Sequence, residues 1–376
     1  MQFMLDLLRT MLGKGGSDLF VTAGFPPAAK LDGRMTRLTD APLTAGDTQI
    51  LARAIMNDRQ IKEFDASKEC NFAIQPAGIG RFRVNAFVQQ GRTGMVLRTI
   101  TTAIPEFDQL GLPPVLKDVV MEKTGLVLVV GGTGSGKSTS LAAMLGVRNA
   151  NSYGHIVSIE DPIEYVHPHR NCLITQREVG VDTESWHAAL KNTLRQAPDV
   201  ILIGEIRDHE TMEHAINFAE TGHLVLSTLH ANNANQALDR VINMFPSEKR
   251  QQLLMDLSLN LRGIISQRLV RKVGGGRVAA VEILLKSPLI ADLIFKGEVH
   301  GIKEIMAKST EMGMQTFDQA LFALHEAGLV SYEDGLRYAD SANELRLRIK
   351  LEGKGAKKGD WSQEGQGLSL ISKDEP

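Results

Sequence analysis

The sequence predicts an α/β protein in which an α+β domain with an antiparallel sheet precedes a nucleotide-binding domain with a parallel sheet. Three observations predict this arrangement. A glycine-rich motif lies between an apolar strand and a helix at residues 126–145, strands and helices alternate after it, and successive strands come before it. The 376 residues are enough for two or three domains, each with its own core.

Residues 1–100 have the pattern of the α+β domain. Apolar residues recur at helical spacing near the N-terminus and again around residue 50, and they alternate with polar residues elsewhere. We therefore expect helices at residues 3–13 and 45–56, and strands at 18–22, 28–31, 35–38, 70–74, 80–89 and 94–99. Residues 101–115 are rich in turn formers and read as an interdomain linker.

Residues 116–351 have the alternation of strands and helices that predicts a parallel sheet covered on both faces. The expected strands are 126–130, 155–159, 200–203 and 224–228, and the expected helices are 137–149, 185–196, 210–221 and 234–243. We expect a long amphipathic helix at 246–270, a β element at 278–285 and short helices to about 351. Residues 352–376 are polar and glycine-rich, which predicts a disordered tail.

The motif at residues 131–139 fits the phosphate-binding P-loop pattern G-x-x-x-x-G-K-[ST]. Its glycines let successive backbone N–H groups point inward, and the start of the next helix adds partial positive charge. Lys137 is expected to reach the β- and γ-phosphates, and the Ser138 hydroxyl to hold Mg²⁺. The residues expected to bind the nucleoside triphosphate are Gly132, Thr133, Gly134, Ser135, Gly136, Lys137, Ser138 and Thr139.

Acidic residues follow two strands of the expected sheet, where ligands of parallel sheets bind. Glu160 and Glu164 come after the second strand and can serve Mg²⁺ and the attacking water. The third strand ends Gly204-Glu205, with glycine where the common pattern has an Mg²⁺-organising aspartate. A solvated acidic turn is the ordinary alternative, but the position at strand ends favours a functional role. Asp208 is expected to cap the following helix.

Two histidines flank the fourth strand. His230 lies at the carboxyl end, where the γ-phosphate is expected, whereas His223 lies at the opposite end and is given a structural role. A histidine beside a strand is more often structural, so only the position of His230 favours function. His167 and His169 are spaced two apart, but no third ligand lies in a suitable frame, and we reject a metal site there.

Composition limits the partners and the compartment. The 42 Lys+Arg against 44 Asp+Glu give a formal charge of −2, so no overall field favours nucleic acid. Cys70 and Cys172 form no C-x-x-C pair, which indicates a reducing compartment and no zinc. No basic leader and no run near ~18 apolar residues occurs, so we expect a cytoplasmic protein.

Four motifs together resemble those of the PilT/PilU family, the type IV pilus retraction ATPases of the secretion ATPase superfamily. They are the P-loop, the acidic segment 160–164, the Gly204-Glu205 strand end and the segment 221–230. Residues 17–20, 80–85 and 313–318 extend the resemblance over nearly the whole chain. It implies a homo-hexameric ring of subunits that each have a PAS-like N-terminal domain and a RecA-like ATPase domain. ATP and Mg²⁺ would bind between the two domains.

The resemblance also implies roles for individual residues. Glu164 would orient the attacking water, with Glu160 as the competing candidate, and Glu205 would support Mg²⁺ through water. His230 would read the γ-phosphate. Three arginines would bind nucleotide or act on a neighbouring subunit, namely Arg81, Arg83 and Arg98. Arginine suits this task because its guanidinium fork matches phosphate oxygens. For at least one of the three, a plain role on the surface of the strand stays open.

Departures from the family pattern make the chain more similar to the PilU group than to the PilT group. It lacks the tetracysteine motif of assembly ATPases, it has no Arg-Asn pair in residues 286–294, and it carries a polar tail. The implied function is to assist pilus retraction together with a PilT-like paralogue. The ring would act on an inner-membrane pilus platform protein and would be bound peripherally to that machinery. The alternative is a ring subunit that binds ATP, hydrolyses little and acts as an adaptor.

Overall fold

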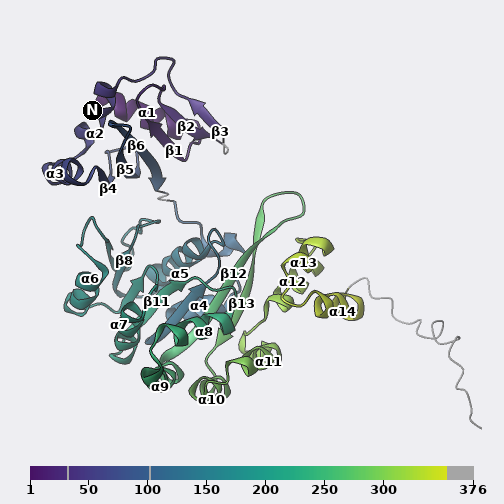
Figure 1. Ribbon diagram of the computed structural model, residues 1–376. Coiled ribbons are helices and arrows are strands. Elements are labelled where there is room, and N and C mark those ends of the chain that lie inside the picture. Colours follow the sequence, from purple (N-terminus) through teal and green to yellow (C-terminus); the bar gives the residue numbers. More distant parts are fainter. Residues whose placement is uncertain (32–33, 101–102, 354–376) are drawn as a thin grey trace, which may run out of the picture.

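The computed structural model describes residues 1–31, 34–100 and 103–353, and two sheets follow each other along the chain (Figure 1). The first is a six-stranded antiparallel sheet in the order β3-β2-β1-β6-β5-β4. Its strands are β1 (Asp18–Val21), β2 (Ala28–Leu31), β3 (Arg34–Arg37), β4 (Glu69–Ile74), β5 (Arg81–Gln89) and β6 (Arg92–Ile100). Its helices are α1 (Gln2–Gly13), α2 (Ala45–Ile55) and α3 (Asp58–Ser67).

Strand β5 shows how this sheet positions its arginines. Phe82, Val84 and Ala86 alternate along the strand and are fully buried in the core that α1 and α2 cover. Since side chains alternate between the faces of a strand, Arg81 and Arg83 lie on the opposite face.

The second sheet has seven strands in the order β13-β12-β7-β11-β10-β8-β9. All neighbours are parallel except the pair β12–β13. The strands are β7 (Gly125–Val130), β8 (Gly154–Glu160), β9 (Cys172–Glu178), β10 (Val200–Ile203), β11 (Leu224–Leu229), β12 (Leu261–Arg271) and β13 (Arg277–Leu285). Strands β7, β10 and β11 are buried along their whole length, as central parallel strands must be.

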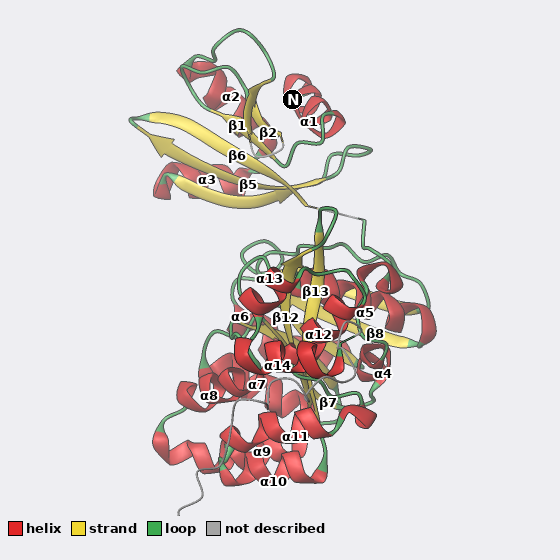
Figure 2. Cartoon of the chain, turned by 90° about the vertical axis from the view of Figure 1, so that its right-hand side faces the viewer, coloured by secondary structure: helices red, strands yellow, loops and turns green. Residues whose placement is uncertain are grey.

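Helices surround this sheet (Figure 2). They are α4 (Val115–Met121), α5 (Lys137–Asn151), α6 (Trp186–Thr193), α7 (His209–Glu220), α8 (Ala234–Met244), α9 (Arg250–Asn260), α10 (Pro288–Lys296), α11 (Ile302–Lys308), α12 (Phe317–Glu326), α13 (Tyr332–Tyr338) and α14 (Ala342–Glu352). Leu126 and Leu128 of β7 face the core shared with α7, α8 and α9, whereas Val127 and Val129 face the core shared with α4 and α5. Both faces are covered, and the predicted α/β class is confirmed.

The predicted helix at residues 246–270 is correct only for residues 250–260 and is wrong beyond them. Helix α9 ends at Asn260, and the chain then forms β12, which pairs in parallel with β7. A run of buried apolar residues does not distinguish a helix from a strand by its period. Strand β9 and helix α3 were not predicted either.

Parts of the predicted linker and of the predicted tail lie outside the residues that the structure describes. The expected linker includes residues 101–102, which lie outside the described residues, and η1 (Phe107–Leu110) with the first residue of α4. The predicted disordered tail also lies outside the described residues from 354 onward. None of the described helices combines the length and apolar character that crossing a membrane requires.

Candidate nucleotide-binding site

The P-loop links β7 to α5 by a turn that packs closely against β12. Gly136, the residue before α5, has a φ of +88°, and a Cβ at this position would lie 2.7 Å from Nε2 of Gln267. A Cβ at Gly131 would lie 2.6 Å from the Gln267 carbonyl oxygen. Only glycine fits these two positions, because neither the backbone conformation nor the space admits a side chain.

Gln267 supports the P-loop and was not predicted from the sequence, because its segment was expected to be part of a helix. It is 2% exposed, its amide donates to the Ser135 carbonyl at 2.8 Å, and it accepts from the Ser140 hydroxyl at 2.7 Å. The Ser135 hydroxyl itself is buried and finds no hydrogen-bond partner among the described residues. Because buried polar atoms are nearly always paired, this hydroxyl fits a ligand oxygen such as that of a phosphate.

Lys137 begins α5 and is 9% exposed. Its ammonium group donates to the backbone carbonyls of Gly131 at 2.8 Å and Gly132 at 3.0 Å. Burial lowers the pKa of Lys137, and the charges of Glu205 and Glu164 oppose that shift. The two acids from different strand ends therefore share an electrostatic environment with the P-loop lysine.

The acids after β8 lie in different surroundings. Glu160 accepts hydrogen bonds from the Ser158 hydroxyl at 2.6 Å and the Gln176 amide at 3.1 Å, and burial raises its pKa. Glu164 is exposed and lines the cavity beside the P-loop.

Glu205 already has two partners at the tip of β10. Its carboxylate accepts from Arg207 at 2.8 Å, and its other oxygen lies 3.3 Å from Nε2 of His230. The aspartate of the common pattern would be crowded at Gly204, because a Cβ there would lie 3.1 Å from the Glu160 Cα. The local packing of β8 against β10 thus accounts for the glycine.

The remaining polar residues separate into structural and cavity-facing groups. Asp208 caps α7 by accepting from the Thr211 amide at 2.8 Å, and the His223 ring contacts the Phe218 carbonyl at 3.0 Å. His230 is partly exposed at the cavity. His167 is buried at the same cavity, and burial lowers its pKa to about 4, so it is neutral near pH 7.

These groups surround one cavity of about 410 Å³, which is within the size range of small-ligand sites. The predicted residues that line it are Thr133, Gly134, Ser135, Gly136, Lys137, Ser138, Thr139, Glu160, Glu164, Glu205 and His230. Gly132 borders a neighbouring hollow with His230 instead. Arg277, at the start of β13, also lines the cavity and was not predicted, since no motif marks it.

The structure does not bring the three predicted arginines to this cavity; its lining, within the described residues, excludes them. Arg81 lies 3.3 Å from the carboxylate of Glu178, which is 5% exposed at the end of β9 and also accepts from the Ile163 amide. Arg98 pairs with Asp18 of its own sheet at 2.7 Å. Arg81 therefore contacts the carboxylate that holds the acidic segment, rather than the cavity itself.

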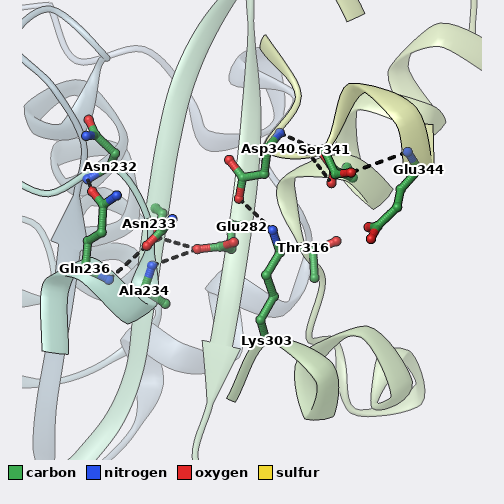
Figure 3. Close-up of polar contacts among 12 residues, drawn as sticks. Asn232, Asn233, Ala234, Gln236, Glu282, Lys303, Thr316, Asp340, Ser341 and Glu344 are labelled. Atoms are coloured by element: carbon green, nitrogen blue, oxygen red, sulfur yellow. Dashed lines mark hydrogen bonds and ion pairs between the residues drawn. The ribbon is translucent and has the colours of Figure 1, made fainter. Parts of the chain in front are cut away.

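Side chains of β12 and β13 bind the backbone of the loop that follows His230 and leads into α8 (Figure 3). Glu282, which is 2% exposed, accepts from the Ala234 amide at 2.7 Å and the Ser266 hydroxyl at 3.1 Å. Arg268 donates to the Asn232 carbonyl at 3.1 Å and pairs with Asp340 at 2.7 Å. Asp340 also forms an ion pair with Lys303 (Figure 3). The C-terminal helices are thereby connected to the loop that carries His230.

Comparisons with known proteins show which family the chain is similar to. The chain matches the family described as Type II/IV secretion system protein over residues 31–331. It is 59% identical over 372 residues to the type IV pilus ATPase PilU of Pseudomonas aeruginosa, covering 98% of this chain and 97% of that relative. It is 45% identical over 329 residues to PilT, named as a type IV pilus retraction ATPase of the same organism, covering 88% and 96%. The crystal structure of the pilus retraction motor PilT with bound ADP is similar with a TM-score of 0.85 at 42% identity, over 91% of this chain and 98% of that one.

Proposed function

The chain belongs to the type IV pilus retraction ATPases of the Type II/IV secretion system family, and from this we propose that it hydrolyses ATP to assist pilus retraction as a hexameric ring. The observation that carries the proposal is the convergence of Lys137, Glu164 and Glu205 on one cavity. A cation and two carboxylates so placed suit phosphoryl transfer to water.

The residues of this chain have separate tasks in the proposed reaction. The P-loop amides and Lys137 bind the phosphates and neutralise charge that develops on them. Glu164 orients the attacking water and accepts its proton, and Glu160 is the competing candidate for that role. His230, beside Glu205, reads the γ-phosphate.

Ser138 and Glu205 would hold Mg²⁺, and their oxygen donors at the cavity fit this hard cation. When bound, the ion stabilises negative charge on the phosphate oxygens. Glu205 also pairs with Arg207 and His230, so these two residues set its orientation.

We propose the assembly that the family relationship suggests. A PAS-like domain of residues 1–100 and a RecA-like domain of residues 116–351 are joined by a linker at 101–115, and Arg81, Arg83 or Arg98 act on a neighbouring subunit. The proposed partners are a PilT-like paralogue and an inner-membrane pilus platform protein, with the ring bound peripherally to that machinery from the cytoplasm. No zinc or nucleic acid is required.

The experiment that tests this function is ATP turnover by the purified chain and its Lys137→Ala variant. Turnover should fall by roughly 10²-fold or more, the usual loss when one preorganised charge-stabilising group is removed. Lys123→Ala is the matched control, because Lys123 is exposed just before β7. Unchanged turnover in Lys137→Ala would refute the assignment of the site, and negligible turnover in the unmodified chain would favour the adaptor.

A further inference from the structure

A cluster of two histidines and one glutamate lies outside the nucleotide cavity. His187 is on α6, and Glu210 and His214 are on α7. One potential ligand atom from each of the three residues lies within 4.8 Å of the others. His187 and Glu210 are in direct contact, and the rings of His187 and His214 have centroids 6.2 Å apart. We propose that this cluster binds a divalent transition-metal ion of the Zn²⁺ class and clamps α6 to α7.

The backbone places the three side chains on one side of the helix pair. Glu210 and His214 are four residues apart on α7, so they share a face of that helix. Helices α6 and α7 pack through a common core to which Ala189, Leu190 and Met212 belong. Both are capped at their N-termini, by Ser185 and Asp208.

The donor set selects the class of metal. Two imidazoles and one carboxylate suit Zn²⁺ and its neighbours, whereas Mg²⁺ and Ca²⁺ prefer oxygen ligands. His187 and Glu210 have more than half of their side chains exposed, which leaves room for a water as the fourth ligand. The carboxylates of Glu210 and Glu213 act electrostatically on His214, and negative charge beside the cluster favours a bound cation.

This inference is independent of the proposed function and differs from the expectation of no zinc, which depended on the cysteines. The clamp lies beside the nucleotide site, because Trp186, the residue before His187, lines the nucleotide cavity. The strand end with Glu205 leads directly into α7. A bound ion would therefore fix α6, which carries Trp186 of the cavity wall, to α7, which follows the strand end with Glu205.

The test is isothermal titration of the tag-free, nucleotide-free full chain with Zn²⁺ in the presence of excess Mg²⁺. We expect one saturable site per chain. His187→Ala, His214→Ala and Glu210→Gln should each weaken binding by at least about tenfold, as the loss of one of three ligands requires. His209→Ala, an exposed histidine on the same helix, is the control and should bind as the unmodified chain does.

Thermal unfolding provides a second readout, since an ion that binds only the folded state raises the midpoint. Zn²⁺ should raise it in the unmodified chain and in His209→Ala, but not in His187→Ala, whose midpoint without metal shows that it folds. The absence of a saturable site in the unmodified chain would overturn the proposal. Binding that survives in the His187→Ala/His214→Ala double variant would also overturn it, since the ion would then bind elsewhere.

Discussion

At the residue scale, the carboxylates of Glu160 and Glu164 differ in what surrounds them. Glu160 accepts from Ser158 and Gln176, whereas Glu164 is exposed to the cavity and acts electrostatically on Lys137. We therefore predict that Glu164→Gln lowers kcat by roughly 10²-fold or more, the usual contribution of a general base. Glu160→Gln should have a smaller effect, because an amide oxygen can still accept both hydrogen bonds.

Steady-state kinetics check this prediction, and thermal midpoints show whether both variants fold. KM for ATP should change little in Glu164→Gln, because the lost interaction belongs to the transition state. A larger loss of kcat in Glu160→Gln than in Glu164→Gln would transfer the water-orienting role to Glu160.

The sequence identified the P-loop residues and the acids of the cavity because the carboxyl ends of parallel strands meet at one edge. It did not identify Gln267 or Arg277. Gln267 supports the P-loop from β12 and Arg277 lines the cavity from β13, and both strands are distant in sequence from the P-loop and carry no motif. Long-range packing of this kind leaves no local pattern in a single sequence.

At the scale of elements, β12 supports the P-loop through Gln267. Gln267→Leu should leave the Ser135 carbonyl and the Ser140 hydroxyl without their buried partner. We expect a loss of about 1–3 kcal/mol in the free energy of unfolding, together with weaker nucleotide binding. Denaturant unfolding and nucleotide titration measure the two effects, with the exposed Arg271→Ala on the same strand as control. Unchanged nucleotide affinity in Gln267→Leu would contradict this supporting role.

The error over β12 has a physical cause. Residues 261–270 mix apolar residues with Arg262, Ser266, Gln267 and Arg268, and this mixture was interpreted as the continuation of an amphipathic helix, although the segment forms a strand between β7 and β13. No proline separates α9 from β12 in the sequence, so this mark of a helix end is absent. The strands β7, β10 and β11 were predicted correctly because turn residues and helices with clear periods separate them.

A second prediction at this scale concerns Glu282, which joins β13 to the start of α8 (Figure 3). Burial raises the pKa of Glu282, and the hydrogen bond from Ala234 opposes this. Because the folded chain then binds the proton more tightly than the unfolded chain, the stabilisation is complete below the unfolded pKa and is lost as pH rises through the folded pKa. Glu282→Gln should avoid that loss.

We therefore expect Glu282→Gln to raise the thermal midpoint at about pH 8 and to have a much smaller effect near about pH 4, where the glutamate is mostly protonated in both states. Thermal unfolding across this pH range measures the difference, with the exposed Glu311→Gln as control. A decrease in the midpoint at the higher pH would show that the ionised carboxylate stabilises α8 more than its burial costs.

At the scale of the whole molecule, the proposed ring shares each site between neighbours. We predict that an alanine variant of Arg81, Arg83 or Arg98 loses turnover by roughly 10³–10⁵-fold if that arginine acts as a finger on the adjacent subunit. Mixing the inactive arginine variant with Lys137→Ala subunits should restore activity, because some interfaces then contain both an intact lysine and an intact arginine. Failure of all three mixtures to recover turnover would contradict a shared site.

The segment 286–294 lacks the Arg-Asn pair of the PilT pattern. Most of it lies in α10, where Leu289 and Phe295 are exposed. The proposal of an assisting motor requires that this chain depend on a paralogue for ordinary retraction. It also requires that its own ATP hydrolysis perform work once the paralogue is present.

The most direct test of that central claim is the fraction of pili that retract in cells whose PilT-like paralogue is present but catalytically inactive. Retraction should occur when this chain is unmodified and should be lost when it carries Lys137→Ala. In cells that lack the paralogue altogether, the unmodified chain should leave ordinary pili extended. Equal retraction with the unmodified chain and with Lys137→Ala would contradict the account, because hydrolysis at this P-loop would then contribute nothing to the movement.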